Sequence, residues 1–484
     1  MSEIIIATSD SKENYRISKL RKAKKLRKIA PRIYSADLDS KPSEIIARNI
    51  LEILGRLYPG ALLSHRSAFE FTLTSSHHIF VTHKYTKKVK LPGVTINFLK
   101  GKGQVEGDNQ QLWGMFVSSK ERAFLENLQS TKKIGPDSKC LGIPQIEEKL
   151  DDILRIKGEE GLNLVRDKAR AIAKALGMKK EMMLLDKMIG ALLSTKPSSL
   201  LKSNLALSRA AGMPYDKVRV ELFHTLFTFL HNQEFKDRAE ENSTVQSFRN
   251  FAFFEAYFSN YIEGTVFEVD EAKRIVDTGV PLATRDGDSH DVLGTYQLVS
   301  DTKGLKNIPG SANEFLTLLQ TRHGQLLSAR IDKHPGQFKE RNNRAGSTQF
   351  VDWKLVRGTL IRAFEFYQAL QHPFARAAYM MFVVSEVHPF EDGNGRIARV
   401  MMNAELVAAE QSKIIIPTVF RDDYMLTIKK MTKRQDPKPF IDMLTKAHEF
   451  SHVLHFEAYD DLYEYLKSHN AFYEPDEGRY LIVD

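Results

Sequence analysis

Residues 387–403 read VHPFEDGNGRIARVMMN, and a second His-Pro-Phe stands sixteen residues earlier, in QHPFARAAYMMFVVSEV (371–387). The earlier copy runs directly into an apolar segment, so Pro373 begins a helix that is apolar on nearly every side. The later copy delays its helix until after Gly395, and the glycines there permit a tight turn. The pair predicts a buried central helix, a glycine-rich loop and a second helix.

The loop has the residue types of a phosphate site. Its N–H groups and those at the start of the helix RIARVMMNAEL (396–406) converge on one spot, which favours an anion. Arg396 and Arg399 lie three residues apart on nearly the same helix face, where two guanidinium groups clamp a polyphosphate. Asp392 supplies the hard oxygen that Mg²⁺ prefers, and His388 is suited to taking a proton from an attacking hydroxyl.

The run HPFEDGNGRIAR (388–399) resembles the motif of the Fic family (filamentation induced by cAMP), HPFx[D/E]GNGRxxR, at every fixed position. The resemblance covers roughly the last half of the chain. It implies transfer of AMP from ATP to a Ser, Thr or Tyr hydroxyl of another protein, with His388, Asn394 and Arg396 as the catalytic set. It also implies these roles: general base His388, loop anchor Phe390, Mg²⁺ ligand Asp392, anion hole Gly393, Asn394 and Gly395, and phosphate clamp Arg396 and Arg399.

The segment SNYIEG (259–264) ends a predicted helix near 244–264. Ser259 and Glu263 are four residues apart and share a helix face, and Gly264 is a C-cap residue. An acid in the last turn opposes the helix dipole, so a cationic partner is expected. The segment matches the Fic inhibitory motif [S/T]xxxE[G/N] of the class with an N-terminal inhibitory helix. That resemblance implies that Glu263 pairs with Arg399 and blocks the γ-phosphate position needed for transfer.

Residues 336–351, GQFKERNNRAGSTQFV, contain two runs that flank an Asn, Arg and Gly tip. They predict a β-hairpin ahead of a helix that starts near Asp352. The hairpin resembles the Fic flap, and the resemblance implies that it holds the modifiable segment of a target protein by strand addition.

The N-terminal half is basic. Residues 1–230 carry 40 Lys and Arg against 24 Asp and Glu, whereas the remainder carries 30 against 37. Within it, RISKLRKAKKLRKIAPR (16–32) holds nine Lys and Arg, no acid, and apolar residues at helical spacing. A basic helix of this kind is typical of a surface that binds duplex DNA or another polyanion, although a solvated helix face has the same pattern.

Strand patterns follow this basic segment. HHIFVTH (77–83) and VTINFLKG (94–101) flank a lysine-rich turn and predict a hairpin with a basic tip. Two helices followed by a basic β-ribbon indicate a winged-helix-like module. YPGALLSHRSAFEFTL (58–73) and LPGVTIN (91–97) resemble the regulatory antitoxins of abortive-infection (type IV) toxin–antitoxin systems.

These patterns divide the chain into a basic module (1–145), a helical bridging region (146–240) and a Fic catalytic domain (241–484). The expected fold is mainly α, a helical bundle with a hairpin flap preceded by an α/β winged-helix-like module. The longest apolar stretch, AAYMMFVV, is far below the roughly 20 residues of a membrane span. Cys140 is the single cysteine and forms no internal disulfide. We therefore expect a cytosolic protein that makes no membrane contact.

Two other functions compete with AMP transfer. One is removal of AMP from a modified protein, or transfer of another phosphate-linked group. The other is a DNA-binding regulator whose Fic half only senses nucleotide, against which the intact His388 counts, since a sensor needs no base. Gly395 argues against a kinase-like variant, because a side chain there would crowd the phosphate cradle. The candidate partners are thus a target protein, duplex DNA and, in a homo-oligomer, a second copy of the chain.

Overall fold

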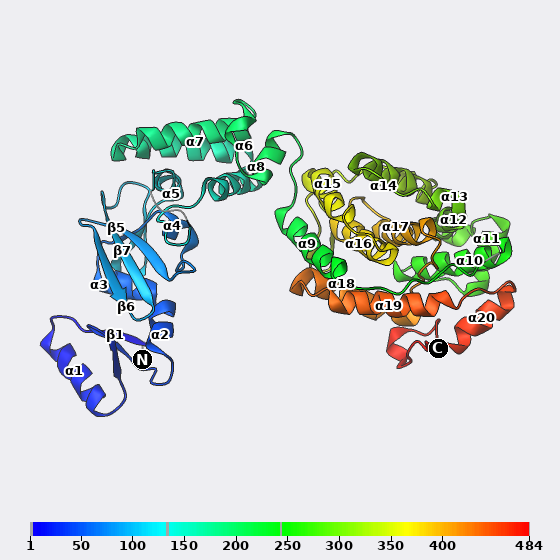
Figure 1. Ribbon diagram of the computed structural model, residues 1–484, viewed down its shortest axis with the longest axis horizontal. Helices are drawn as coiled ribbons and strands as arrows, with labels where there is room; N and C mark the ends of the chain where they lie inside the picture. The colour runs from blue at the N-terminus through cyan, green and yellow to red at the C-terminus, as the bar shows by residue number, and fades with distance from the viewer. Residues whose placement is uncertain (1–2, 132–134, 243, 484) are drawn as a thin grey trace. The chain divides into compact units, whose positions relative to one another are not determined.

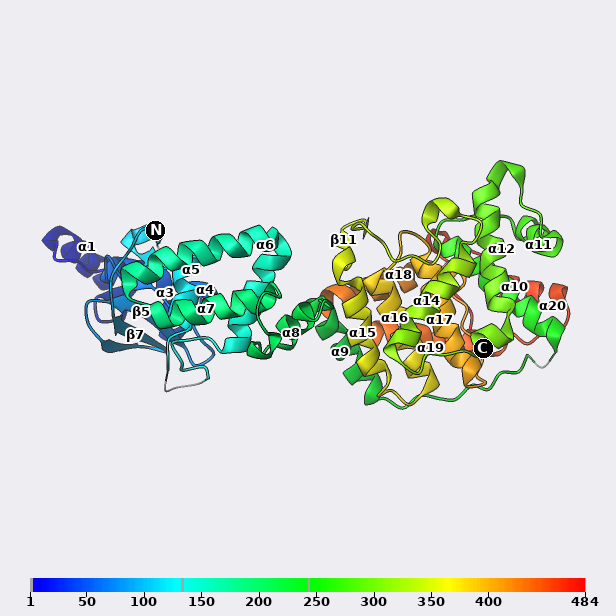
Figure 2. The same cartoon turned by 90° about the horizontal axis from the view of Figure 1, so that it is seen from above.

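The computed structural model describes residues 3–131, 135–242 and 244–483, which form two compact units, Met1–Gly212 and Met213–Asp484. Unit 1 combines helices with two sheets, and unit 2 is almost wholly helical (Figures 1 and 2). This is the expected fold class: a mainly helical chain whose N-terminal part is an α/β module. No helix among the described residues is long and apolar enough to cross a membrane.

Unit 1 contains a three-stranded sheet of order β1-β3-β2 and a six-stranded mixed sheet of order β6-β7-β5-β4-β9-β8. The small sheet consists of β1 (Ile4–Ile6), β2 (Arg27–Ala30) and β3 (Ile33–Ser35). The large sheet consists of β4 (Leu62–Leu63), β5 (His78–His83), β6 (Lys87–Leu91), β7 (Val94–Lys100), β8 (Asn109–Gln110) and β9 (Phe116–Val117). The α-helices of unit 1 are α1 (Ser11–Lys22), α2 (Pro42–Arg48), α3 (Ile50–Leu57), α4 (Arg66–Glu70), α5 (Lys120–Asn127), α6 (Ile143–Leu176), α7 (Lys179–Leu192) and α8 (Asn204–Ala210).

The predicted basic helix over 16–32 is only half correct. Helix α1 ends at Lys22, Lys24 has a left-handed φ of 54°, and the chain then forms strand β2. Ile29 and Ala30 are buried against the neighbouring strand β3, so burial in the sheet overrides the helical spacing of the apolar residues.

The predicted hairpin between 77–83 and 94–101 is wrong. Strands β5 and β7 pair in parallel, with Ile79 opposite Ile96, and the lysine-rich segment is itself a strand, β6, antiparallel to β7. The reason is the alternation in KKVKL: Val89 is half-buried, whereas Lys88 and Lys90 on either side are exposed. The lysines therefore lie along the edge of a sheet and not at the tip of a wing.

The stretch 146–240, predicted as a helical bridge, is helical but is shared between the two units. Helices α6, α7 and α8 belong to unit 1, while α9 (Lys217–His231) belongs to unit 2. Leu222, Phe223 and Leu226 of α9 are buried in the main core of unit 2. The whole of α9 is therefore part of the helical bundle.

Unit 2 is a helical bundle with one small hairpin. After α9 its helices are α10 (Val245–Ile262), α11 (Val269–Thr278), α12 (Asp286–Ser300), α13 (Thr302–Leu305), α14 (Ala312–Leu326), α15 (Val356–Tyr367), α16 (Pro373–Val387), α17 (Asn394–Ala408), α18 (Arg421–Arg434), α19 (Lys438–His452) and α20 (Tyr459–Ser468). The hairpin consists of β10 (Arg344–Ala345) and β11 (Thr348–Gln349). Figure 1 shows α16 and α17 inside the bundle, with the other helices around them.

Helix α16 is the central helix that the apolar pattern predicted. It begins at Pro373, capped by the His372 side chain, which accepts a hydrogen bond from the Phe374 N–H at 3.1 Å. Its residues are buried on almost every side, and it packs against α17, which is buried over most of its length. The loop between these two helices is thus held at both ends by buried structure.

Helices α12 and α14 approach each other closely at a glycine. A Cβ atom added to Gly294 of α12 would lie 2.1 Å from the carbonyl oxygen of Leu326 in α14. A backbone atom cannot move aside as a side chain can, so the packing of these two helices depends on the missing side chain at position 294.

Gly294→Ala is expected to destabilise the protein by about 1–3 kcal/mol, the usual cost of overpacking. Gly324→Ala in α14 is the matched control, because its added Cβ meets no atom closer than 3.7 Å. That control should be neutral, or more stable by up to about 1 kcal/mol from helix propensity. Urea unfolding followed by circular dichroism measures both changes, and equal stability of the two variants would contradict the packing argument.

Candidate active site

The loop between α16 and α17 is closed by one side chain. The Asn394 Oδ1 accepts a hydrogen bond from the Phe390 N–H at 2.8 Å, and its Nδ2 donates to the Phe390 carbonyl oxygen at 3.0 Å. His388 and Gly393 take left-handed φ values of 53° and 73° on either side. Asn394 is buried, so its side chain fixes the loop, while its backbone N–H, in the first turn of α17, has no intrahelical partner.

A second histidine, on α14, contacts the loop from the side of the helical bundle. His323 of α14 stacks on Phe390 with ring centroids 3.7 Å apart. Its Nδ1 accepts a hydrogen bond from the Gly336 N–H at 2.9 Å, so its Nε2 carries the proton and donates to the Asp392 carbonyl oxygen at 3.0 Å. Burial lowers the pKa of His323 to about 4. The sequence does not point to this residue, because a lone histidine in a helix carries no signal of its partners.

His388 is positioned as a neutral base. Its ring stacks on Phe350 with centroids 3.7 Å apart, and its Nδ1 donates to the Ser385 carbonyl oxygen at 3.3 Å. That bond leaves Nε2 as the proton acceptor. Burial lowers the pKa of His388 to about 4, so the ring is uncharged at neutral pH.

The Asp392 carboxylate lies at the mouth of the loop and is partly exposed. It accepts a hydrogen bond from the Gly393 N–H at 2.7 Å and lies 3.8 Å from the Lys333 ammonium and 3.6 Å from the Arg396 guanidinium. The described residues contain no cluster of three or more His, Cys, Asp or Glu side chains able to hold a metal. A lone carboxylate suits a magnesium ion that takes its other ligands from phosphate and water.

The two arginines of α17, predicted as a phosphate clamp, are both engaged by other side chains of the bundle. Arg396 is buried and forms an ion pair with Asp291 of α12 at 2.8 Å. Arg399 is also buried, and its Nη1 lies 3.3 Å from the Tyr424 hydroxyl. Asp291 was not found from the sequence, since it lies about a hundred residues away with no spacing that links it to the loop.

The residues of the 259–264 segment meet Arg399 directly. Arg399 donates to the Ser259 hydroxyl at 2.9 Å, to the Ser259 carbonyl oxygen at 2.7 Å and to Glu263 Oε1 at 2.7 Å. Gly264, with φ of 93°, follows the helix end as the spacing predicted. Glu263 also abuts Gly395, where an added Cβ would lie 2.0 Å from Glu263 Oε1. The carboxylate therefore lies against the glycine at the N-terminus of α17.

The predicted hairpin within 336–351 is present, with two residues in each strand. Its base is joined to the loop between α16 and α17, because the Lys339 N–H donates to the Pro389 carbonyl oxygen and the Asn343 side chain donates to that of Phe390, both at 2.9 Å. A cavity of about 180 Å³ lies between this hairpin and α18. Glu263, His388 and Gly395 all line the cavity.

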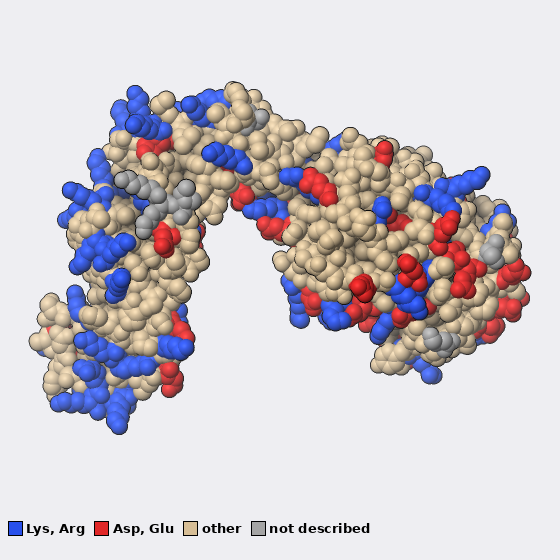
Figure 3. Space-filling view, viewed as in Figure 1, with Lys and Arg blue, Asp and Glu red and all other residues tan. Residues whose placement is uncertain are grey.

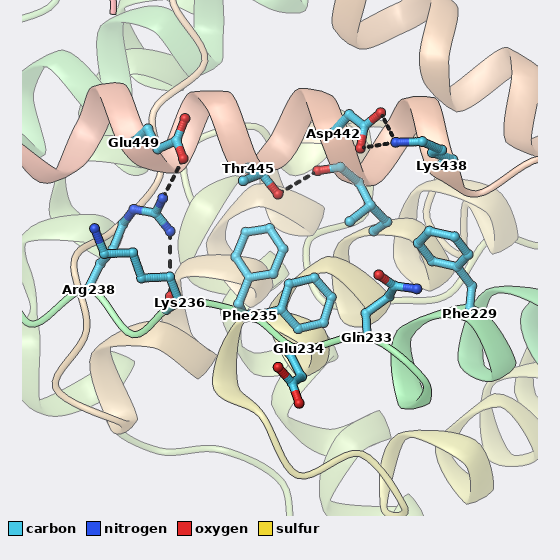
Figure 4. Close-up of a pocket in the computed structure, with 12 residues that line it drawn as sticks. Phe229, Gln233, Glu234, Phe235, Lys236, Arg238, Lys438, Asp442, Thr445 and Glu449 are labelled. Carbon is cyan, nitrogen blue, oxygen red and sulfur yellow. Dashed lines mark hydrogen bonds and ion pairs between the residues drawn. The ribbon is translucent and has the colours of Figure 1, made fainter. Parts of the chain in front are cut away.

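A second hollow, of about 350 Å³, lies between the 229–238 segment and α19 (Figure 4). Its apolar wall contains Phe229 and Phe235, and its charged side chains form the ion pairs Arg238–Glu449 and Lys438–Asp442. None of the residues predicted for the site lines it. Of the two hollows, the cavity beside the hairpin is the one lined by predicted site residues.

A profile of the Fic/DOC family matches residues 316–406, which include the whole 388–399 motif. The matched residues lie in the second unit, from α14 to α17, and are similar to a Fic/DOC domain. A curated relative, the protein adenylyltransferase Fic of Drosophila willistoni, is 24% identical over 241 residues, covering 46% of this chain and 45% of its own. The chain thus spans less than half the length of this relative.

Solved Fic structures are similar to this chain at lower identity. Fic-1 (aa134–508) from C. elegans is 15% identical, covers 68% of this chain and 98% of its own, and gives a TM-score of 0.36. A Fic domain containing signaling protein from Bacteroides thetaiotaomicron VPI-5482 is 17% identical, covers 50% of this chain and 97% of its own, and gives a TM-score of 0.39.

His323→Phe is expected to weaken the loop between α16 and α17. The ring stacking stays, while two buried hydrogen bonds are lost, which lowers the free energy of unfolding by about 1–3 kcal/mol. The effect depends on pH. The pKa of His323 in the folded protein, about 4, lies below its ordinary value of 6.5. As the pH falls, the unfolded chain therefore binds a proton at this histidine before the folded protein does. The wild type loses stability as the pH falls from about 6.5 to about 4. The full loss from this group is about 3 kcal/mol.

The variant lacks this acid-linked loss, so the stability gap between it and wild type should be widest near pH 7 and narrow toward pH 4. Urea unfolding at several pH values measures the gap. His231→Phe, at an exposed position at the end of α9, is the control. A gap that stays constant with pH would show that His323 is not held neutral by burial.

Proposed function

We propose that this protein transfers AMP from ATP to a Ser, Thr or Tyr hydroxyl of a protein. The main support for this proposal is that three residues line one cavity: the neutral base His388, Gly395 at the start of α17, and Thr348 of the flap. A base, an anion-binding helix terminus and a strand for a peptide thus border one space. The Drosophila relatives named protein adenylyltransferase Fic support the same activity.

In the proposed step the target hydroxyl attacks the α-phosphorus of ATP. An O–P bond forms, the bond between the α-phosphorus and the bridging oxygen to the β-phosphate breaks, and pyrophosphate leaves. His388 Nε2 takes the hydroxyl proton, which its lowered pKa permits at neutral pH because the ring is uncharged. A base with a pKa this low is a weak acceptor, so the step depends on positioning and on charge stabilisation of the phosphates.

The phosphates are assigned to the loop and to α17. The proposed anion hole is formed by the N–H groups of Asn394 and Gly395 together with that of Gly393, which the Asp392 carboxylate engages in the structure. Arg396 and Arg399 are proposed to hold the β- and γ-phosphates. Asp392 is the proposed Mg²⁺ ligand, and a bound Mg²⁺ would offset negative charge that develops on the leaving pyrophosphate.

Glu263 is the proposed restraint on this activity. Its carboxylate engages Arg399 and lies against Gly395, so it occupies the anion site at the helix N-terminus. A triphosphate that reaches this site must displace it. Removal of AMP from a modified protein is the alternative use of the same carboxylate, which would orient a water molecule toward the phosphodiester.

Glu263→Gly is expected to raise self-modification with labelled ATP by roughly tenfold or more, since a charge-assisted hydrogen bond is worth about 1.5–3 kcal/mol. The double variants Glu263→Gly with Arg399→Ala and Glu263→Gly with His388→Ala should both lose this gain. The first lacks the freed arginine and the second lacks the base. Label transfer is measured on gels with excess Mg²⁺.

Glu268→Gly is the matched control, because Glu268 precedes α11 outside the site. Equal transfer by wild type and Glu263→Gly would refute the restraint. Label transfer that survives His388→Ala would refute the mechanism. Hydrolysis of AMP from the labelled protein, lost in Glu263→Gly while transfer rises, would identify the alternative activity.

We also propose that unit 1 binds duplex DNA. Unit 1 carries 38 Lys and Arg against 22 Asp and Glu, whereas unit 2 carries 32 against 39. Lys and Arg gather over unit 1 in the space-filling view, and the densest acidic surface in that view lies on unit 2 (Figure 3). Lys87, Lys88 and Lys90 are exposed along the edge strand β6, which suits contacts to successive phosphates.

Binding of the full chain to a fluorescent DNA duplex should weaken steeply with salt, through counterion release. Changing Lys87, Lys88 and Lys90 together to Gln should make the plot of log K against log salt less steep. The magnitude of its negative slope should fall by up to about 3, at roughly 0.9 per phosphate contact. The same change at Lys303, Lys446 and Lys467, all exposed on unit 2, is the control. No binding at low salt, or equal slopes for both triple variants, would count against this surface.

A further inference from the structure

Arg219 makes three connections from the first turn of α9, outside the segment 316–406 that matches the Fic/DOC profile. Its Nε lies 2.9 Å from Glu386 Oε1, and its Nη2 donates to the Gln349 carbonyl oxygen at 2.8 Å. Its backbone N–H donates to the Asp216 side chain that caps the helix, at 3.1 Å. One residue thus joins α9, α16 and the flap strand β11.

Glu386 places this connection beside the chemistry. It is buried on α16, two residues before His388, and it lines the cavity under the flap. Its second carboxylate oxygen accepts a hydrogen bond from the Thr432 hydroxyl of α18 at 2.7 Å. Glu386 therefore links the two walls of the cavity, and Arg219 is the cation that balances its buried charge.

The start of α9, which carries Arg219, is held against α15. The Asp216 N–H donates to the Thr359 hydroxyl of α15 at 2.9 Å. Pro214, two residues before Asp216, packs so closely on α15 that a Cβ at Gly358 would lie 2.2 Å from the Pro214 carbonyl oxygen. The guanidinium of Arg219 therefore extends from a backbone that is locked to the bundle.

The flap, in contrast, has little support of its own. It is an exposed hairpin with two residues in each strand, and an isolated two-stranded hairpin is marginally stable in water. The hydrogen bond from Arg219 to Gln349 joins the strand to the bundle one residue before Phe350, the ring that stacks on His388. This contact therefore helps to set the position of the flap over His388, together with the Lys339 and Asn343 hydrogen bonds at the base of the hairpin and the Lys433–Ser347 hydrogen bond from α18.

We propose that Arg219 is a positioning residue that holds the flap over His388 and so governs how well a protein target binds. The part that concerns target binding rests on the proposed function. The contact between Arg219 and the Gln349 carbonyl oxygen, called the tether below, does not rest on it, because its effect on the flap can be measured in the free protein.

The tether is tested by the rate at which trypsin cuts after Arg344, an exposed residue in β10, measured by mass spectrometry on the full chain. Arg219→Ala should raise this rate roughly tenfold, since it removes a hydrogen bond from a charged donor. Arg219→Lys, which keeps one charged donor, should restore part of the protection. The control is Arg357→Ala, the same change at an exposed position of α15.

Glu386→Gln keeps the shape and the Thr432 partner but removes the charge that orients Arg219, so it should give a smaller rise. It also serves if Arg219→Ala fails to fold. Cleavage after Arg344 at the control rate in Arg219→Ala, or in Glu386→Gln when the first variant does not fold, would overturn the tether.

Target binding is tested in chains that also carry Glu263→Gly, with the His388→Ala chain as the protein acceptor at increasing concentration. Arg219→Ala should raise the KM for this acceptor several-fold and leave the affinity for ATP unchanged. An unchanged acceptor KM in a chain whose flap is cut faster would overturn the role in target binding. Absence of transfer by every Glu263→Gly chain would instead refute the proposed function, and the trypsin result would still decide the tether.

Discussion

The active site depends on the clasp between the Asn394 side chain and the backbone of Phe390. Two buried helices are joined there by six residues, and the clasp supplies the acceptor for the buried Phe390 N–H and a second donor, beside Asn343, for the Phe390 carbonyl oxygen. With the loop closed in this way, the N-terminus of α17 has free N–H groups and a positive dipole beside His388. The stacked pair His323 and Phe390 supports the same loop from the bundle side.

The two arginines of α17 show how buried charge shapes the site. A buried guanidinium needs a partner, and each arginine has found a carboxylate from another helix. Asp291, the partner of Arg396, is 8% exposed and belongs to α12 within the bundle. Glu263, the partner of Arg399, is 34% exposed and lies at the end of a helix. Glu263 is the more exposed of the two carboxylates, and this difference suits it to the reversible restraint proposed above.

The sequence predicted the parts of the structure that local pattern controls. The apolar run of α16, the glycine loop, the Ser259 and Glu263 spacing and the flap hairpin were all found in this way. The errors lie where long-range burial decides the outcome. Residues 27–30 form a strand because a sheet partner covers Ile29 and Ala30, and β5 pairs in parallel with β7 because the lysine-rich segment between them is itself a strand.

The sequence by itself determined which chemical groups the site has, because the motif 388–399 and the 259–264 segment each carry their residues at short, regular spacing. The tertiary structure decided which distant residues engage those groups. Asp291, His323 and Arg219 lie on separate helices, far from the motif along the chain, and only packing brings them to Arg396, the loop and the flap. Local spacing reflects the geometry of a single helix or turn, whereas contacts between helices depend on how the whole bundle buries its apolar faces.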